Sequence, residues 1–353
     1  MTAGLRREAT AAAYGLGFTL VGTTTLAPAD TARFYDAWLD AGHAGAMRYM
    51  HHYKKHRRDP RALLPTARSA IVVAMPYGGH APPGPVARYA RGADYHDVMR
   101  TRLDALHATL AERAGHTVIA KSIVDSTPLL ERDLARRAGL GWFGKNTLLI
   151  NPHEGSFFLL GALLTDLDLP SDPPFTADRC GRCTRCLDAC PTDAFVAPRT
   201  LDARRCIAYL TIELRGPIPP DLRPPMADLL FGCDICQDVC PWNVRFATDR
   251  PDPALADTLG PLDPAEILRL DDATFTARFA HSPIARATRA GLARNAAIAL
   301  GNTGTAAAVP ALTDALSDDD PLVRDHAAWA LDRIRARLTA TPPAATPTAP
   351  RCT

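Results

Sequence analysis

Apolar positions follow two different periods in the first 170 residues. Helical spacing indicates helices at residues 3–16 and 30–41, and a longer helix from about Tyr95 to Ala114 that ends at Gly115. A further helix is expected to start at Pro128. Strands are indicated by apolar runs at 18–23, 69–77, 117–124, 147–150 and 156–165. Because strands and helices alternate, residues 1–170 are predicted to form an α/β or α+β domain.

The pattern changes in the second half of the chain. A Pro- and Asp-rich linker leads into a cysteine-rich segment, which we assign to a ferredoxin-like domain over residues 171–248. Residues 262–338 are predicted helical, and Arg294–Leu300 is echoed about thirty residues later by Arg324–Leu331, as in a HEAT-type solenoid. Two repeats are marginal alone, so we expect this tail to pack on the cysteine-rich segment. Residues 339–353 are Ala/Thr/Pro-rich and are predicted to be disordered. The expected fold class is α+β.

The composition indicates the class of protein and its cellular compartment. The chain of 353 residues has 47% hydrophobic and 22% charged residues, as in ordinary globular proteins. Its formal net charge of +2 requires any nucleic-acid contact to come from local basic patches. The N-terminus lacks a signal-peptide pattern and no apolar stretch is long enough to span a membrane, so we expect a cytoplasmic protein. Neither G-x-G-x-x-G after a strand nor a P-loop is present, which leaves nucleotide binding by those motifs unsupported.

Eight of the nine cysteines fall into a pattern typical of iron–sulfur proteins. Cys180 to Pro191 reads C-G-R-C-T-R-C-L-D-A-C-P, the cysteine run of bacterial two-cluster ferredoxins. A second run, C-D-I-C-Q-D-V-C-P, starts at Cys233 and is one cysteine short, and Cys206 between the runs can supply the missing ligand. Two [4Fe–4S] clusters are therefore predicted. Cys352 lies in the terminal tail and is excluded as a ligand.

In the ferredoxin pattern the last cysteine of each run binds the cluster of the other run. This crossing assigns one cluster to Cys180, Cys183, Cys186 and Cys240. It assigns the other cluster to Cys190, Cys206, Cys233 and Cys236. Zinc ribbons also use C-x2-C pairs and are the competing interpretation, although they need neither the third cysteine at this spacing nor the Cys-Pro endings.

A basic run lies between residues 48 and 61. It carries six Lys or Arg and three His around two tyrosines. Such a run is either a solvated surface helix or a patch that binds phosphate groups of a nucleic acid or cofactor.

Several long motifs, in the same order, resemble the epoxyqueuosine reductase family. They are D-S-T-P-L-L-E-R-D-L-A-R-R-A-G-L-G-W-F-G-K-N-T from Asp125, N-P-H-E-G-S-F-F-L-L-G-A-L-L from Asn151, D-A-R-R-C-I-A-Y-L-T-I-E-L from Asp202, the first cysteine run, and F-G-C-D-I-C-Q-D-V-C-P-W-N ending at Asn243. The resemblance spans about residues 5–335. It implies an N-terminal corrinoid-binding domain and a cobalamin-dependent oxidoreductase that converts epoxyqueuosine to queuosine at the wobble position of tRNA with a GUN anticodon. The resemblance further implies an external one-electron donor, and we expect a monomer.

The resemblance places the proton donor of this reaction at Asp125. A carboxylic acid that donates a proton at neutral pH needs a raised pKa, which an apolar pocket under a corrin can provide. The competing interpretation is that Asp125 caps the helix expected at Pro128.

Cobalamin contacts are expected from Arg57, Tyr95, Asp125, Lys145 and Ser156. Lys145 and Ser156 also fit purely structural roles, as a loop lysine and as the start of a strand. His96 can face the same pocket or be structural. The D-x-H-x-x-G pattern of cobalt-ligating histidines fails here, because Met99 stands where Gly is needed. Cobalamin is therefore expected base-off or without a His ligand.

Contacts with tRNA are expected from basic residues on the run at 48–61 and on the helical tail. The candidates are Lys54, Lys55 and Arg58 on the run, and Arg286, Arg289 and Arg294 on the tail. Two other functions remain open from the sequence. One is reductive dehalogenation of a small molecule by a corrinoid enzyme, and the other is electron carriage by a ferredoxin-type protein.

Overall fold

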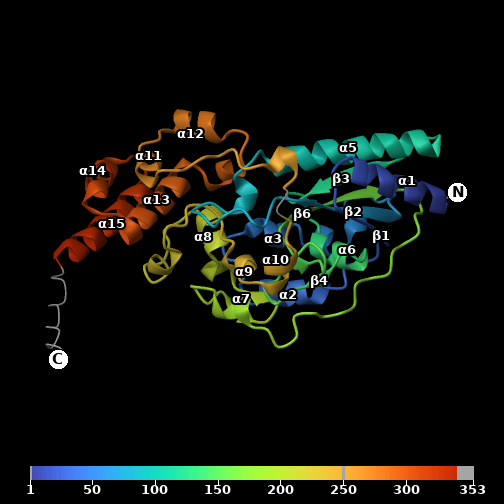
Figure 1. Ribbon diagram of the computed structural model, residues 1–353, viewed down its shortest axis with the longest axis horizontal. Coiled ribbons are helices and arrows are strands. Elements are labelled where there is room, and N and C mark those ends of the chain that lie inside the picture. The colour runs from blue at the N-terminus through green and yellow to red at the C-terminus, as the bar shows by residue number, and fades with distance from the viewer. Residues whose placement is uncertain (1, 249–250, 340–353) are drawn as a thin grey trace, which may run out of the picture.

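The structure is a computed structural model that describes residues 2–248 and 251–339. A four-stranded sheet with the order β1-β2-β6-β3 forms the first part of the molecule (Figure 1). Its strands, in that order, are Leu20–Thr25, Ser69–Pro76, Phe158–Thr165 and Ala120–Val124. Every neighbouring pair of these strands is antiparallel. This pairing decides between the two predicted classes and makes the fold α+β.

Helices cover both faces of the sheet. Helices α1 (Thr2–Gly15) and α5 (Tyr95–Ala114) pack on one face, and α6 (Glu131–Arg137) packs on the other (Figure 1). Alternate side chains of β2 point to opposite faces, so that Val73 packs with α1 and α5 whereas Val72 packs with α6. Burial on both faces explains the unbroken apolar run that predicted this strand.

The segment after β3 differs from the prediction. The helix expected at Pro128 begins at Glu131, with Leu130 as an N-cap that makes no side-chain hydrogen bond. The strand expected at 147–150 lies outside the main sheet, in a hairpin of β4 (Trp142–Phe143) and β5 (Leu149–Ile150). Pairing with a neighbour distant from the main sheet is a tertiary effect that local apolar periodicity does not report.

Short helices joined by loops make up the cysteine-rich segment, which lies between the sheet and the helical tail (Figure 1). They are α7 (Arg185–Asp188), α8 (Ile207–Ile212), α9 (Ile235–Asp238) and α10 (Pro241–Phe246), with a small hairpin of β7 (Phe195–Ala197) and β8 (Thr200–Leu201). Three α-helices lie between β1 and β2 in the chain, namely α2 (Ala32–Asp40), α3 (Arg48–His52) and α4 (Lys54–Arg58).

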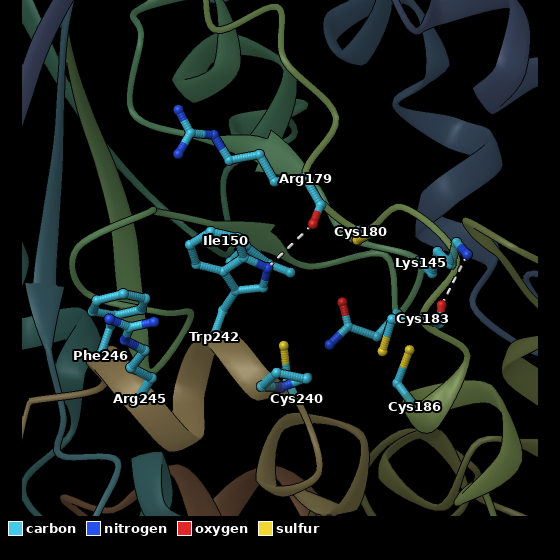
Figure 2. Close-up of a pocket in the computed structure, with 12 residues that line it drawn as sticks. Lys145, Ile150, Arg179, Cys180, Cys183, Cys186, Cys240, Trp242, Arg245 and Phe246 are labelled. Atoms are coloured by element: carbon cyan, nitrogen blue, oxygen red, sulfur yellow. Dashed lines mark hydrogen bonds between the residues drawn. The ribbon is translucent and has the colours of Figure 1, made fainter.

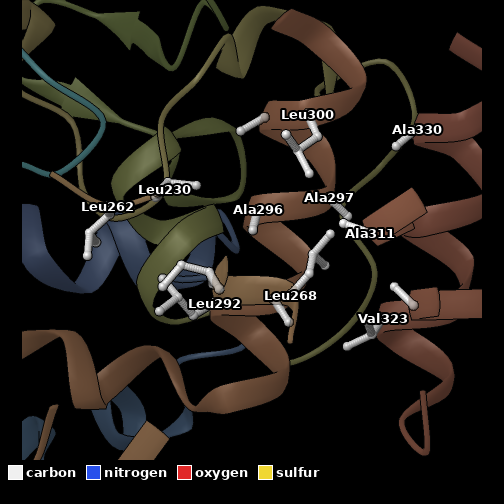
Figure 3. Close-up of a cluster of buried hydrophobic side chains, with 14 of the residues drawn as sticks. Leu230, Leu262, Leu268, Leu292, Ala296, Ala297, Leu300, Ala311, Val323 and Ala330 are labelled. Carbon is white, nitrogen blue, oxygen red and sulfur yellow. The ribbon is translucent and has the colours of Figure 1, made fainter. Parts of the chain in front are cut away.

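The tail is helical and packs on the cysteine-rich segment, as predicted. It consists of α11 (Pro264–Leu268), α12 (Asp272–Phe279), α13 (Arg289–Thr303), α14 (Val309–Asp314) and α15 (Pro321–Thr339). Its apolar core is joined by Leu230 of the cysteine-rich segment (Figure 3). Phe231 of the same segment and Val86 of the first part also belong to this core. No described helix is both long and apolar enough to cross a bilayer. The disorder expected for the terminal tail, with Cys352, falls on residues 340–353, which lie outside the described residues.

Candidate active site

Asp125 lies directly after β3, at the start of the turn that leads to α6. Its φ of +33° is uncommon for a residue other than glycine, and such conformations concentrate at functional sites. The side chain keeps 59% of its surface exposed, and its Oδ2 accepts a hydrogen bond from the Tyr95 hydroxyl. His96 Nε2 lies 3.4 Å from the same oxygen. Asp125 therefore bonds to the start of α5, and the interpretation that it caps the following helix is wrong.

His96 is held between two carboxylates. Its Nδ1 lies 2.7 Å from Asp94 Oδ1 and its Nε2 faces Asp125, while its ring stacks on Tyr95 with centroids 4.1 Å apart. Burial alone would lower the pKa of His96, but the hydrogen bonds to Asp125 and Asp94 raise this pKa to about 9. Both ring nitrogens are engaged, so the ring is charged at neutral pH and offers no free nitrogen to a metal.

The hydrogen bond that raises the pKa of His96 lowers the pKa of Asp125. Partial desolvation by the surrounding protein favours a raised pKa for this carboxyl group, although much of its side chain is exposed, but hydrogen bonds from His96 and Tyr95 outweigh that effect and lower the pKa below its usual value. The raised pKa expected for Asp125 is therefore not present in this arrangement. The ionised Asp125 is paired with a protonated His96, so the proton is held by the pair.

Arg57 lies near this pair, beside Tyr49. The side chain of Arg57 is buried, and its guanidinium carbon is 5.9 Å from the centre of the Tyr49 ring, while that of Arg286 is 5.8 Å from the same ring. Burial and the charge of Glu213 raise the pKa of Tyr49 to about 12, and the charges of Asp125 and Arg57 also act on it. Tyr49 thus marks where the basic run, the helical tail and the surroundings of Asp125 meet.

Glu131 is a second carboxyl group in this region. Burial, followed by the charge of Asp125, raises the pKa of Glu131 to about 8, so the group is mostly protonated at neutral pH. Its Oε1 is buried and accepts no hydrogen bond from any described residue. A buried acceptor without a donor is uncommon in proteins and has the right chemistry to receive an amide or hydroxyl group of a bound molecule.

Two of the expected cobalamin contacts have other partners. Lys145 Nζ donates to the backbone carbonyls of Gly181 and Cys183, both at 2.8 Å, and so supports the first cysteine loop. Ser156 is buried, and its hydroxyl donates to Gln237 Oε1 at 2.9 Å. Both side chains join the first part of the chain to the cysteine-rich segment, which differs from the role predicted for them.

Four cysteines line one cavity of about 300 Å³. They are Cys180, Cys183, Cys186 and Cys240, the set that the crossed ferredoxin pattern predicts for one cluster, and their Sγ atoms face a shared space (Figure 2). Burial, together with the thiols of Cys240 and Cys180, raises the pKa of Cys186 to about 11. The crowded thiols resist becoming thiolates together, and several iron cations would relieve that repulsion. The donor set and the cavity therefore fit a [4Fe–4S] cluster.

The other four cysteines form a second group, and like most of the first set they are partly buried. Burial raises the pKa of Cys233 to about 12, and the neighbouring thiols of Cys206 and Cys190 contribute to this rise. Cys206 and Cys233 pack against an interior apolar cluster that includes Trp38 and Met47. The backbone N–H of Ala194 lies 3.3 Å from Cys190 Sγ, a hydrogen bond of the kind that stabilises cluster sulfur ligands.

The expected tRNA contacts on the tail are largely used within the protein. Arg294 is fully buried and donates to the backbone carbonyls of Leu214, Gly216 and Leu210, so its assignment as a tRNA contact is wrong. Arg294 lies in a helical repeat, and the sequence alone does not show which face of that helix is buried.

The remaining tRNA candidates differ in their exposure and in their ion pairs within the protein. Arg289 keeps only 12% of its side-chain surface and pairs with Asp318 at 2.8 Å, which leaves little of it for a nucleic acid. Lys54 and Arg58 both pair with Asp36. Lys55 is exposed and forms no ion pair with another described residue.

Comparisons with known proteins identify the family of the chain and of its segments. Residues 179–243 match the 4Fe-4S double cluster binding domain, residues 57–126 match the model of epoxyqueuosine reductase QueG, DUF1730, and residues 283–348 match HEAT repeats. The epoxyqueuosine reductase of Xanthomonas campestris pv. campestris is 43% identical over 329 residues, covering 89% of this chain and 92% of that protein. The chain belongs to the epoxyqueuosine reductase family.

Other members of the family are similar over comparable lengths. The epoxyqueuosine reductase of Pseudomonas aeruginosa is 41% identical, with 90% of this chain and 91% of that protein covered. A crystal structure of epoxyqueuosine reductase with an epoxyqueuosine-modified tRNA-Tyr stem loop is 32% identical, with a TM-score of 0.86 over 95% of this chain and 91% of that one. Membership in the family makes the protein an oxidoreductase. The match to the double cluster domain supports iron–sulfur clusters over the zinc-ribbon interpretation.

The sequence alone assigns no role to several residues of this candidate site. Glu131 fits a helix and Tyr49 fits the basic run. Glu213, which pairs with Arg286, lies near the end of a family motif that does not by itself indicate a role for this residue. Glu131 directly follows the apolar Pro128-Leu129-Leu130, and this position is a signal in the sequence that the carboxyl group is near apolar surroundings. The contact between Tyr49 and Arg286 depends on tertiary packing alone.

Proposed function

We propose that this protein reduces the epoxide of epoxyqueuosine to the alkene of queuosine at the wobble position of tRNA with a GUN anticodon. The observation that carries the proposal is the 43% identity to an epoxyqueuosine reductase over 89% of the chain. The tRNA stem loop bound by the structural relative supports the choice of substrate. We further propose that the protein acts as a monomer in the cytoplasm.

The reaction consumes two electrons and two protons, and the epoxide oxygen leaves as water. An alkoxide is a poor leaving group, so a proton must reach the oxygen as the C–O bond breaks. In our proposal the His96–Asp125 pair delivers that proton, which passes from the protonated His96 by way of the Asp125 carboxylate to the epoxide oxygen. The raised pKa of His96, about 9, supports this role because the pair holds its proton at neutral pH. Glu131, with a pKa of about 8, is a second proton store within the influence of Asp125.

Two kinds of cofactor are proposed. The two [4Fe–4S] clusters would be held by the two cysteine sets described above, and when bound they pass electrons one at a time. Bound cobalamin would supply the low-valent cobalt chemistry that acts on the epoxide carbon. We propose that Arg57, Tyr95 and Asp125 face the corrinoid, and that Glu131 Oε1 accepts from one of the amide groups at the edge of its ring. His96 would not ligate cobalt, because both of its ring nitrogens face carboxylates.

The tRNA surface is proposed to include the basic run beside Asp125. Lys55 is exposed and forms no ion pair with another described residue, so its charge can contact phosphate. Lys54 and Arg58 share a single carboxylate, that of Asp36, so part of their positive charge also remains for phosphate. Arg286 lies over Tyr49 of this run and keeps 54% of its side-chain surface exposed. We therefore propose Arg286 in place of Arg294 as the contact from the tail.

An anaerobic assay tests the proposed function. The reconstituted protein, with cobalamin and a chemical reductant, is mixed with tRNA that carries epoxyqueuosine, and the nucleosides are analysed by mass spectrometry. We expect queuosine to form, and to form only when both reductant and cobalamin are present. Persistence of epoxyqueuosine in protein that contains both clusters and bound cobalamin would sink the proposal.

A further inference from the structure

We propose that the rim of the cavity lined by Cys180, Cys183, Cys186 and Cys240 is the docking surface for a small acidic protein that carries single electrons. This inference rests on the proposed reduction, which needs two electrons per epoxide, and it names the kind of partner that supplies them. The partner class follows from the exposure, charge and apolar content of this surface.

The cavity opens at the surface of the protein. Cys180, Cys183 and Cys186 are only partly buried, and the lining residues Arg179, Pro241 and Arg245 are exposed. The indole of Trp242 closes one side of the cavity and donates a hydrogen bond to the carbonyl of Arg179 at 3.3 Å (Figure 2). Because electrons pass between proteins only when their redox centres come close, a partner that contacts this rim is well placed to reduce the adjacent cluster.

Two exposed arginines on the cavity lining, Arg179 and Arg245, make this rim positive, and the first cysteine run carries two further exposed arginines, Arg182 and Arg185. None of the four forms an ion pair with another described residue. The guanidinium carbon of Arg179 lies 5.7 Å from the centre of the Phe175 ring, and that of Arg245 lies 5.0 Å from that of Phe246. Aromatic rings rather than carboxylates therefore position these two cations, and their charge remains available to a partner.

Acidic side chains on the same loops are few. Asp178 pairs with Arg199 at 2.5 Å, and Asp188 accepts a hydrogen bond from the hydroxyl of Thr184 at 2.8 Å. Asp193 is exposed. The surplus of positive charge favours a partner with an acidic face and would accelerate its encounter at low salt.

Apolar surface accompanies this charge. Val244 is 63% exposed, and the half-buried rings of Trp242 and Phe246 stack with centroids 5.5 Å apart. An apolar patch with a charged rim suits a brief encounter, and complexes between electron-transfer proteins bury small interfaces. The partner would therefore bind weakly and leave after each transfer.

The position of the second thiol set makes this rim the outer end of the electron path. Gln237, the residue after Cys236, donates a hydrogen bond to the Tyr77 hydroxyl at 3.1 Å, so this thiol set lies near that ring. The ring of Tyr77 is 6.3 Å from that of Tyr89, and Tyr89 is 5.8 Å from Tyr95, which bonds to Asp125. The second set therefore lies beside the aromatic rings that lead to the reacting groups, whereas the first set lies at the open rim.

RNA is the other polyanion that a basic surface can attract. The wobble base must reach Asp125, and the cations that act on that residue are His96 and Arg286. The arginines of the rim surround thiols instead. A protein carrier gains from contact with a cluster, whereas tRNA does not, so we assign the rim to the carrier.

The electron balance requires two dockings per turnover. Each reduced carrier gives up one electron and leaves oxidised, so two carriers and two protons convert one epoxide into one alkene and one water. The carrier must be of low potential, as flavodoxins and ferredoxins are.

The test uses the reconstituted protein with two probes, a flavodoxin and a plant-type ferredoxin. Binding is measured by calorimetry at low and at physiological salt for the wild type, for Arg179→Glu/Arg245→Glu, and for the control Arg7→Glu/Arg333→Glu. The control arginines are exposed, and Arg333 stacks on Trp329 as Arg245 stacks on Phe246. We expect at least one probe to bind the wild type, with a Kd that rises at least tenfold in the rim variant and less than twofold in the control.

Three further measurements separate the possible results. Iron content and turnover with a chemical reductant should stay within twofold of the wild type in the rim variant, and so should the affinity for a tRNA stem loop. Loss of RNA binding with carrier binding retained would overturn the proposal, as would failure of both probes to bind the wild type. If the wild type converts epoxyqueuosine with the chemical reductant, the proposed function stands whichever result the carriers give.

Discussion

At Asp125, three neighbouring side chains determine where one proton resides. Tyr95 and His96 donate to the carboxylate, which favours its ionised form, and Asp94 supports the charge on His96 from the other side. The identity of Asp125 as a candidate could be reached from the family motif. Its partnership with His96 could not, because the two residues lie on different elements and the coupling arises only when β3 meets the start of α5.

The pH dependence of turnover follows from this pair. Because the folded pKa of His96 is about 9, we expect kcat at saturating tRNA to be flat from about pH 6.5 to 8 and to fall about tenfold per unit above about pH 9. The pKa is raised above the unfolded value of about 6.5, so the stabilisation by this pair is complete below that pH and is lost as the pH rises towards 9. The measurement is a kcat profile of the wild type and of His96→Gln. An alkaline limb that starts near pH 6.5, or that survives unchanged in the variant, would contradict the assignment.

At the scale of elements, α13 is fixed by a buried cation. Arg294 and Asn295 bond to backbone carbonyls of the cysteine-rich segment, including those of Leu210 and Leu230. The repeat that contains Arg294 predicted the helix correctly. It did not reveal which face of the helix is buried, because Ala, Arg and Asn follow one another without a strong apolar stripe. The tail is thus joined to the cysteine-rich segment by polar as well as apolar contacts.

Removing this cation should destabilise the packing of the tail. Arg294→Ala leaves several buried carbonyls without a donor, and we expect a loss of about 3 kcal/mol in the free energy of unfolding. Helix content followed by circular dichroism in urea gives the measurement, with the exposed Arg335→Ala on α15 as the matched control. Equal stability of the two variants would refute the structural role. The salt dependence of tRNA affinity should not change in Arg294→Ala, whereas a direct phosphate contact would reduce its slope by about one.

At the scale of the whole molecule, segments predicted as separate domains share their cores. The α+β class, the helical tail and the cysteine-rich segment were accessible from periodicity and cysteine spacing. Contacts across the predicted domain boundaries could not be predicted from the sequence. Val86 pairs with Phe231 as an isolated bridge, and Arg88 pairs with Asp234 and Asp238 beside the second cysteine run. Such contacts depend on chain reversal over many residues, which leaves no local pattern in the sequence.

The crossing of the two cysteine runs is testable at this scale. Cys240 follows Cys236 by four residues, yet the cavity groups Cys240 with Cys180. We therefore expect Cys240→Ala and Cys180→Ala to lose the same cluster, with identical residual spectra by electron paramagnetic resonance and about four irons per chain instead of about eight. Cys236→Ala should lose the other cluster. Matching spectra for Cys240→Ala and Cys236→Ala would mean that the runs do not cross.

The most direct test of the account is turnover by Asp125→Asn. The substitution keeps the shape of the side chain but removes the carboxylate that pairs with His96, so general acid catalysis should fail. With epoxyqueuosine-bearing tRNA, cobalamin and a chemical reductant, we predict that kcat falls at least about a hundredfold while iron content and tRNA affinity stay unchanged. The exposed Asp97→Asn on α5 is the matched control and should turn over normally. Normal turnover by Asp125→Asn would contradict the central claim that the Asp125–His96 pair delivers the proton.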